Sequence, residues 1–146
     1  MTAAHIFLGG ALIAVNLAAG LWGLFGWWRR RHAPGFWPLL RVGQGLVVLQ
    51  AADGAILLLM GRDLPELHLI YGLVPLGVSF VAEQLRLAAA DTVLAQRDLE
   101  GRADVEALPE REQRALVNAI VRREMGVMAT SAVVVALLGV RAAGLP

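Results

Sequence analysis

The sequence predicts an all-α fold, a transmembrane antiparallel four-helix bundle, from three observations. Hydrophobic residues make up 58% of the 146 residues and charged residues only 17%, which is too apolar for an ordinary soluble domain. Four apolar stretches follow one another along the chain. The arginines gather in alternate connections between these stretches, as they do in multi-pass membrane proteins. The length predicts a single membrane domain over residues 1–146.

The first two spans are predicted over about residues 4–28 and 36–60. No charged side chain occurs from Met1 to Trp28, and at about 1.5 Å per residue this run exceeds a hydrocarbon core of about 30 Å. Arginines follow it directly, and no small-residue cleavage pattern does, so a cleaved signal peptide is not expected. Pro34 and Gly35 suit a tight connection before the second span.

The third and fourth spans are predicted over about residues 67–86 and 124–143. Their charge-free parts are short. The flanking charged residues Glu83, Arg123 and Arg141 must therefore lie at the membrane interface or extend toward it.

Residues from about 87 to 123 are predicted to form a helical hairpin that extends the third and fourth helices into the cytoplasm. The third helix is expected to continue to Glu100, since the chain from Glu83 contains no Pro or Gly, and to stop at Gly101. Pro109 suits the first position of the fourth helix. The acidic residues that follow it suit the positive end of the helix dipole.

The arginine distribution predicts which side of the membrane each connection faces. Ten arginines lie in the first and third connections, and only Arg62 and Arg141 lie on the other side. Because cytoplasmic flanks collect arginine, we expect a multi-pass protein of the cell membrane with both termini extracytoplasmic. The tryptophans of an aromatic belt gather at the inner boundary, with Trp22 about one turn deeper. They are Trp27, Trp28 and Trp37.

Four strings taken together carry a resemblance to known proteins. They are GLWGLFGWWRRR at the end of the first span, HLIYGLVPL and FVAEQLR in the third, and IVRREMGVM entering the fourth. They resemble an uncharacterised family of small actinobacterial four-helix integral membrane proteins, over the whole chain. The resemblance implies the membrane fold and brings no activity or site residue.

Polar side chains within the spans are the candidate functional residues, because polar groups are costly in lipid. They are Asn16, Arg41, Gln44, Gln50, Asp53, Tyr71 and Glu83. The four on the second span are spaced in multiples of three, so they share a ridge that is expected to face the other helices. The favoured interpretation is an interhelical hydrogen-bond seam, and the alternative is a proton or ion path.

Depth along the helices predicts partners for the two charged residues of the second span. Asp53 is matched with Tyr71 and His68 on the third span, with Asn16 deeper. Near the inner surface Arg41 is matched with Glu83, so an ion pair is expected there. The pair is expected to extend to other charged residues, and the same arginines could instead bind an anionic lipid head group. These residues are Arg86, Arg122, Arg123 and Glu124.

Histidines give the most specific cofactor hypothesis. His5 and His68 open two spans on the outer side, where two imidazoles could bind the iron of haem b. The favoured alternative is two interfacial histidines with their polar tips in water. A mixed cluster on the same side could take copper or zinc, while His32 lies on the other side. Its members are Met1, Met60, Asp63 and Glu66.

Small residues in the first two spans predict tight helix packing within the chain or against another subunit. They are Gly9, Gly10, Ala19, Gly20, Gly23, Gly26, Gly43, Gly45 and Gly54. The chain has no cysteine, which excludes disulfides and thiolate chemistry, and its near-neutral charge gives no reason to expect nucleic acid. The preferred function is a non-enzymatic membrane module, as a homo-oligomer or an accessory subunit. The alternative is a small redox or transport protein that uses His5 and His68, or Asp53.

Overall fold

The computed structural model describes residues 3–31, 33–62 and 65–144, and over these ranges all the regular structure is helical. The helices are α1 (Ala3–Arg29), α2 (Phe36–Leu59), α3 (Glu66–Ala95), α4 (Arg102–Ala107) and α5 (Glu110–Ala142). All except the six-residue α4 are long and apolar enough to cross a membrane. For the described residues, the predictions of an all-helical fold and of four long apolar helices are confirmed.

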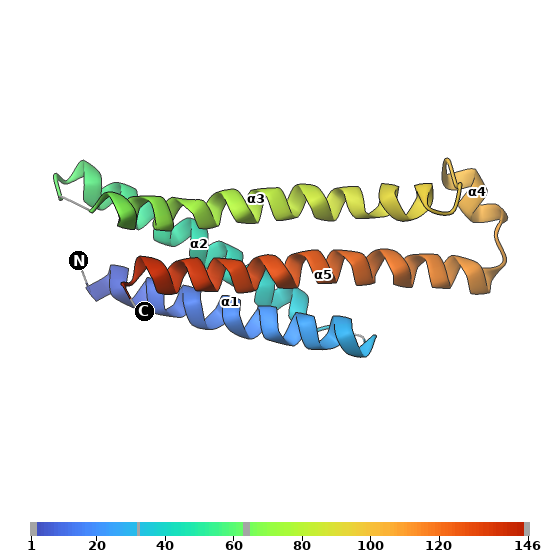
Figure 1. Ribbon diagram of the computed structural model, residues 1–146, viewed down its shortest axis with the longest axis horizontal. Helices are drawn as coiled ribbons and strands as arrows, with labels where there is room; N and C mark the ends of the chain where they lie inside the picture. The colour runs from blue at the N-terminus through green and yellow to red at the C-terminus, as the bar shows by residue number, and fades with distance from the viewer. Residues whose placement is uncertain (1–2, 32, 63–64, 145–146) are drawn as a thin grey trace.

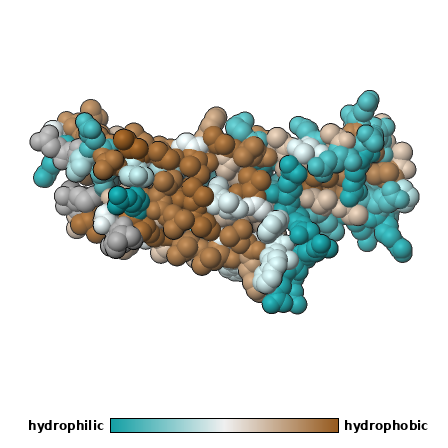
Figure 2. Space-filling view, in the orientation of Figure 1, coloured by the Kyte–Doolittle hydropathy of each residue, from teal (hydrophilic) through white to brown (hydrophobic). Residues whose placement is uncertain are grey.

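The long helices lie alongside one another over half of the molecule (Figure 1). α1 packs against both α2 and α5, and α3 packs along α5, whereas α2 touches α3 and α5 only lightly. The start of α1 and the end of α5 lie at the same end of the molecule, and α3 and α5 continue side by side beyond the other two helices to α4. Figure 2 shows hydrophobic side chains over the four-helix part and hydrophilic ones over this extension.

The same backbone capping motif ends α1, α2 and α3. The residue at the turn has a positive φ, and the two amides after the helix bond back to its last carbonyls. Gly61 takes this conformation after α2 with a φ of 75°, which glycine adopts without steric cost. Arg30 and Asp98 take it after α1 and α3, with φ of 53° and 54°.

The predicted end of the third helix is wrong. α3 stops at Ala95, because Asp98 enters the left-handed region and the amide of Leu99 bonds to the carbonyl of Leu94. An aspartate tolerates this conformation better than most residues, so the helix needs no glycine to end there. Gly101 has extended backbone and precedes α4, a short helix that periodicity did not predict.

The core is built around close contacts between α1, α2 and α5. Phe36 and Met128 are fully buried in its larger cluster. A Cβ added at Gly23 would lie 2.5 Å from the Phe36 ring and 2.7 Å from the Ala129 Cβ, so only glycine allows these helices to meet there. The predicted tight packing is confirmed at this position, whereas a Cβ at Gly10 would meet no atom within 4 Å.

We predict that Gly23→Ala destabilises the protein in detergent, by about 1–3 kcal/mol, because the added methyl group overpacks the contact with Phe36 and Ala129. Gly10→Ala is the matched control on the same helix, and it should be neutral or slightly stabilising since alanine favours helix. Thermal unfolding of the two variants in one detergent provides the measurement. Equal stability of Gly23→Ala and Gly10→Ala would contradict the packing described.

Candidate functional site

The polar side chains of the spans gather in two clusters at different depths. The terminal cluster lies at the end of the molecule that holds the start of α1 and the end of α5. It consists of His5, Gln50, Asp53 and His68. The glutamate cluster lies nearer the extension of α3 and α5. It consists of Arg41, Gln44, Glu83 and Arg86.

His5 is the centre of the terminal cluster. Its side chain is only 4% exposed, and its Nδ1 lies 2.8 Å from Oδ2 of Asp53 on α2. Its Nε2 lies 3.0 Å from Nε2 of Gln50, one turn earlier on α2. Because a carboxylate only accepts hydrogen bonds, Nδ1–H donates to Asp53 while Nε2 accepts from the Gln50 amide. In this orientation of the Gln50 amide, both ring nitrogens of His5 contact α2.

The Gln50 amide can also present its other end to the His5 ring. Its Oε1 is buried and has no hydrogen-bond partner in the part of the chain that the structure describes. If the amide turned by about 180°, Oε1 would face Nε2 of His5 and could accept a hydrogen bond from a protonated ring. The Gln50 amide can therefore present either a donor or an acceptor to the His5 ring.

His68 binds to the end of α5, and not to Asp53. Its Nδ1 lies 2.9 Å from the backbone oxygen of Ala142, to which it donates. Tyr71 lies under the guanidinium of Arg141, 5.8 Å from the ring centroid to Cζ. The prediction that Asp53 pairs with Tyr71 and His68 is therefore wrong, because the start of α1 occupies the position beside Asp53.

The favoured interpretation of the histidines as interfacial side chains in water is also wrong for His5, which α2 covers. The rings of His5 and His68 lie 5.8 Å apart between centroids, with 48° between their planes. Two imidazoles that bind a haem iron each need a ring nitrogen for it. Both nitrogens of His5 already contact Asp53 and Gln50, so the arrangement does not fit the predicted haem site.

Two members of the predicted mixed metal cluster, Met1 and Asp63, lie outside the described residues, as does His32. Over residues 3–31, 33–62 and 65–144, no three His, Cys, Asp or Glu side chains are close enough to hold a metal ion. Met60 and Glu66 are both exposed at the ends of their helices.

The glutamate cluster contains the expected Arg41–Glu83 ion pair. Oε1 of Glu83 accepts from Nη1 of Arg41 at 2.5 Å and from Nε2 of Gln44 at 2.8 Å. Oε2 accepts from Nε of Arg86 at 2.8 Å. Three donors thus converge on one carboxylate, two of them from α2, and the cluster joins α2 to α3 where these helices otherwise pack lightly.

The predicted extension of this ion pair is confirmed only for Arg86. The guanidinium of Arg122 lies over the Trp27 ring instead, 5.7 Å from its centroid. Among the described residues, Arg123 and Glu124 form no ion pair with Glu83. Arg122 lies beside Trp27 of α1, and Arg123 lies at a groove between α3 and α5.

An apolar layer separates the two clusters. Val47 lies on the same ridge of α2, midway between Gln44 and Gln50, and is buried with Leu12 and Val135. Asn16 is buried one turn beyond Leu12, where its Nδ2 donates to the backbone oxygens of Leu12 at 2.9 Å and Gly43 at 3.2 Å. The ridge of polar residues predicted along α2 is therefore interrupted, and its polar side chains do not form a continuous path.

We predict that Asp53→Leu destabilises the protein by about 1–2 kcal/mol, since it leaves the buried His5 without its carboxylate partner. His5→Leu should destabilise to a similar extent, and the double variant less than the sum of the two. Thermal unfolding in detergent gives the coupling energy, about 0.6–1.7 kcal/mol. Glu66→Leu, an exposed carboxylate at the same end, is the control, and strictly additive effects would refute the pair.

For the glutamate cluster, we predict that Glu83→Gln costs more stability than Arg41→Gln or Arg86→Gln. The glutamate substitution weakens three charge-assisted hydrogen bonds, whereas each arginine substitution removes only one strong contact to the carboxylate. The expected loss for Glu83→Gln is about 1.5–3 kcal/mol by chemical or thermal unfolding. Glu106→Gln removes an exposed ion pair on α4 and should change stability by less than about 1 kcal/mol.

Comparison with known proteins gives no indication of the function of these clusters. No protein family model, curated protein or solved structure matches the chain. The resemblance to small actinobacterial membrane proteins therefore stays a prediction.

Proposed function

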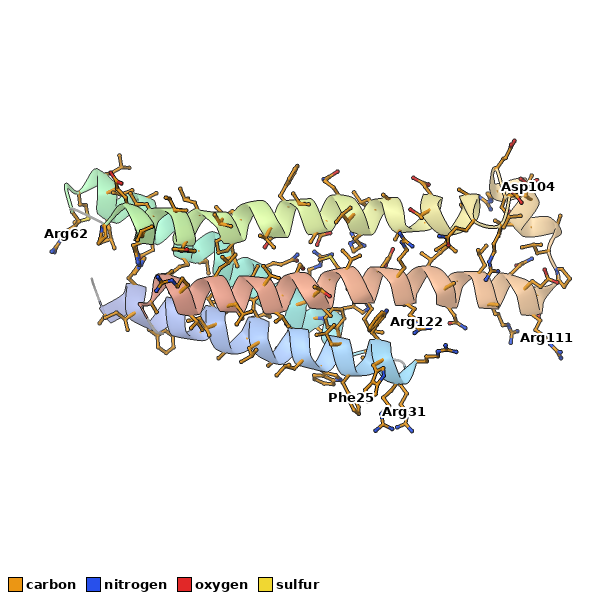
Figure 3. All side chains as sticks on the ribbon, viewed as in Figure 1. Phe25, Arg31, Arg62, Asp104, Arg111 and Arg122 are labelled. Carbon is orange, nitrogen blue, oxygen red and sulfur yellow. The ribbon has the colours of Figure 1, made fainter. Side chains whose placement is uncertain are left out.

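We propose that this chain is a multi-pass protein of the cell membrane, an antiparallel bundle whose two termini lie outside and whose α3–α5 extension lies in the cytoplasm. Figure 3 supports this orientation, because Arg62 lies at the end with the termini while Arg31, Arg122 and Arg111 lie toward the extension. Arginine-rich flanks stay on the cytoplasmic side. Arg29 adds an interfacial feature there, since its guanidinium lies 5.3 Å from the Phe25 ring and 5.6 Å from that of Trp28.

Within the membrane, the chain acts as a non-enzymatic module, either a homo-oligomer or an accessory subunit of a larger assembly. The observation that carries this proposal is that the polar side chains of the spans bind one another across helices. His5 binds Asp53 between α1 and α2, and Arg41 binds Glu83 between α2 and α3. Since lipid offers polar groups no partners, such contacts hold the helices in one arrangement.

A second function is favoured by one observation, the buried Oε1 of Gln50, which has no hydrogen-bond partner among the described residues and belongs to the amide that contacts His5. A small transport or redox protein could use such a group. The buried layer of Leu12, Val47 and Val135 argues against a path through the bundle, because it separates the two clusters with apolar side chains. The module is therefore the better-supported function.

The proposed topology predicts which residues an impermeant thiol reagent reaches in intact cells. The natural chain contains no cysteine, so single-cysteine variants report one position each. Glu66→Cys, at the start of α3, should react with an impermeant maleimide from outside. Glu112→Cys, in the first turn of α5, should react only after the membrane is opened. Reaction of Glu112→Cys in sealed cells would overturn the orientation.

A second experiment tests whether the protein is a non-enzymatic module. The variants Glu66→Cys and Glu112→Cys are its controls, since both replace exposed acidic residues at opposite ends of the molecule. Purified in mild detergent, the protein should run as a defined oligomer or with a stoichiometric partner. A Soret absorbance band in that sample would contradict the non-enzymatic proposal and favour the redox function.

A further inference from the structure

A groove between α3 and α5 on the membrane-facing surface is not used by either polar cluster. It holds about 870 Å³, within the range of roughly 300–1,000 Å³ that is typical of ligand sites. On α3 its wall includes Val74, Gly77, Val81 and Leu85, which recur at helical spacing. These four residues are exposed.

The length of the groove indicates what fits in it. On α5 its lining runs from Arg123 to Val134, and on α3 from Val74 to Leu85. Eleven steps of helical rise give about 16 Å, close to half of a hydrocarbon core of about 30 Å. The groove therefore matches one leaflet, which is the length of a lipid acyl chain, and it is too short for a helix that crosses both leaflets.

The wall of the groove presents an apolar surface even where its residues are polar. Thr130 donates to the backbone oxygen of Gly126 at 2.9 Å, and Ser131 to that of Met128 at 2.8 Å. Their hydroxyl donors are thus satisfied within α5 and need nothing from an occupant. A hydrocarbon chain can lie against them without leaving a polar group unpaired.

Charge is present at only one end of the groove. Arg123 lines that end, is exposed, and forms no ion pair with any residue that the structure describes. Trp27 lines the groove as well and holds the guanidinium of Arg122 over its ring. An unpaired guanidinium beside an indole, at the end of an apolar groove one leaflet long, suits an anionic head group.

We propose that this groove binds an anionic glycerophospholipid, with an acyl chain between α3 and α5 and the phosphate at Arg123. The proposal rests on the chain being embedded in a membrane and goes beyond the function proposed above. Arg123 supplies selectivity for charge, while the groove between Gly77 and Thr130 supplies affinity for the chain. The two contributions can be removed separately.

The test measures lipid retention by native mass spectrometry of purified full-length protein. The protein is incubated with equal amounts of phosphatidylglycerol and phosphatidylcholine that carry identical acyl chains. We expect the anionic lipid to be retained about fivefold more than the zwitterionic one, the ratio that one arginine near a membrane surface provides. Arg123→Gln should abolish this preference while some lipid stays bound. Arg111→Gln, an exposed arginine on the extension, should keep the preference.

A second pair of variants tests the groove itself. A Cβ at Gly77 or at Gly72 meets no atom within 4 Å, so a side chain can start at either position of α3 without a clash at its first carbon. Gly77→Leu fills the groove and should reduce retention of both lipids, whereas Gly72→Leu lies outside it and should not. Thr130→Leu repeats the test from the α5 wall.

Three results would overturn the proposal: unchanged retention in both Gly77→Leu and Thr130→Leu, an anionic preference that survives Arg123→Gln, or no preference in the natural protein. Loss of an oligomer in Gly77→Leu with lipid retention unchanged would assign the groove to a second copy of the chain instead. Because the lipid measurement does not depend on which side the extension faces, its failure would leave the labelling test of the topology unaffected.

Discussion

The contact between Gly23 of α1 and Phe36 of α2 fixes the register of these two helices, on which the terminal cluster depends. The first residue of α2 lies beside a glycine six residues before the end of α1, so the two helices do not meet end to end. Counting away from this contact, Asn16 and Gly43 are each seven residues distant, and they share a hydrogen bond. A larger residue at position 23 would shift this register.

The same register brings His5 beside Asp53, which lie eighteen and seventeen residues from the Gly23–Phe36 contact. Close packing holds some pairs of helices together, and polar contacts hold others. α1 and α5 approach through small side chains such as Gly20 and Ala129. α2 and α3 pack lightly, and the carboxylate of Glu83 joins them. In lipid, where apolar surfaces gain little from meeting one another, both kinds of contact are needed.

The sequence predicted the helices well because hydrophobicity and arginine placement act locally, and it predicted the pairing of polar residues less well because pairing depends on register. The Arg41–Glu83 pair was predictable, since both side chains need a partner near the same interface. The partner of Asp53 was not predictable, because the depth of a residue along its helix does not show which neighbouring helix lies beside it. The register set where Phe36 packs beside Gly23 places His5 there. The early end of α3 was also not predictable, because the left-handed backbone conformation of Asp98 leaves no periodic signal in the sequence.

The buried layer of Leu12, Val47 and Val135 has a consequence for how the protein can change over time. Gln44 and Gln50 flank it at a separation of six residues, about 9 Å along the helix, and share no hydrogen-bond partner among the residues that the structure describes. Sites that far apart without common partners usually contribute additively to stability. Each end of the bundle can therefore accumulate substitutions, and acquire new chemistry, without compensating changes at the other.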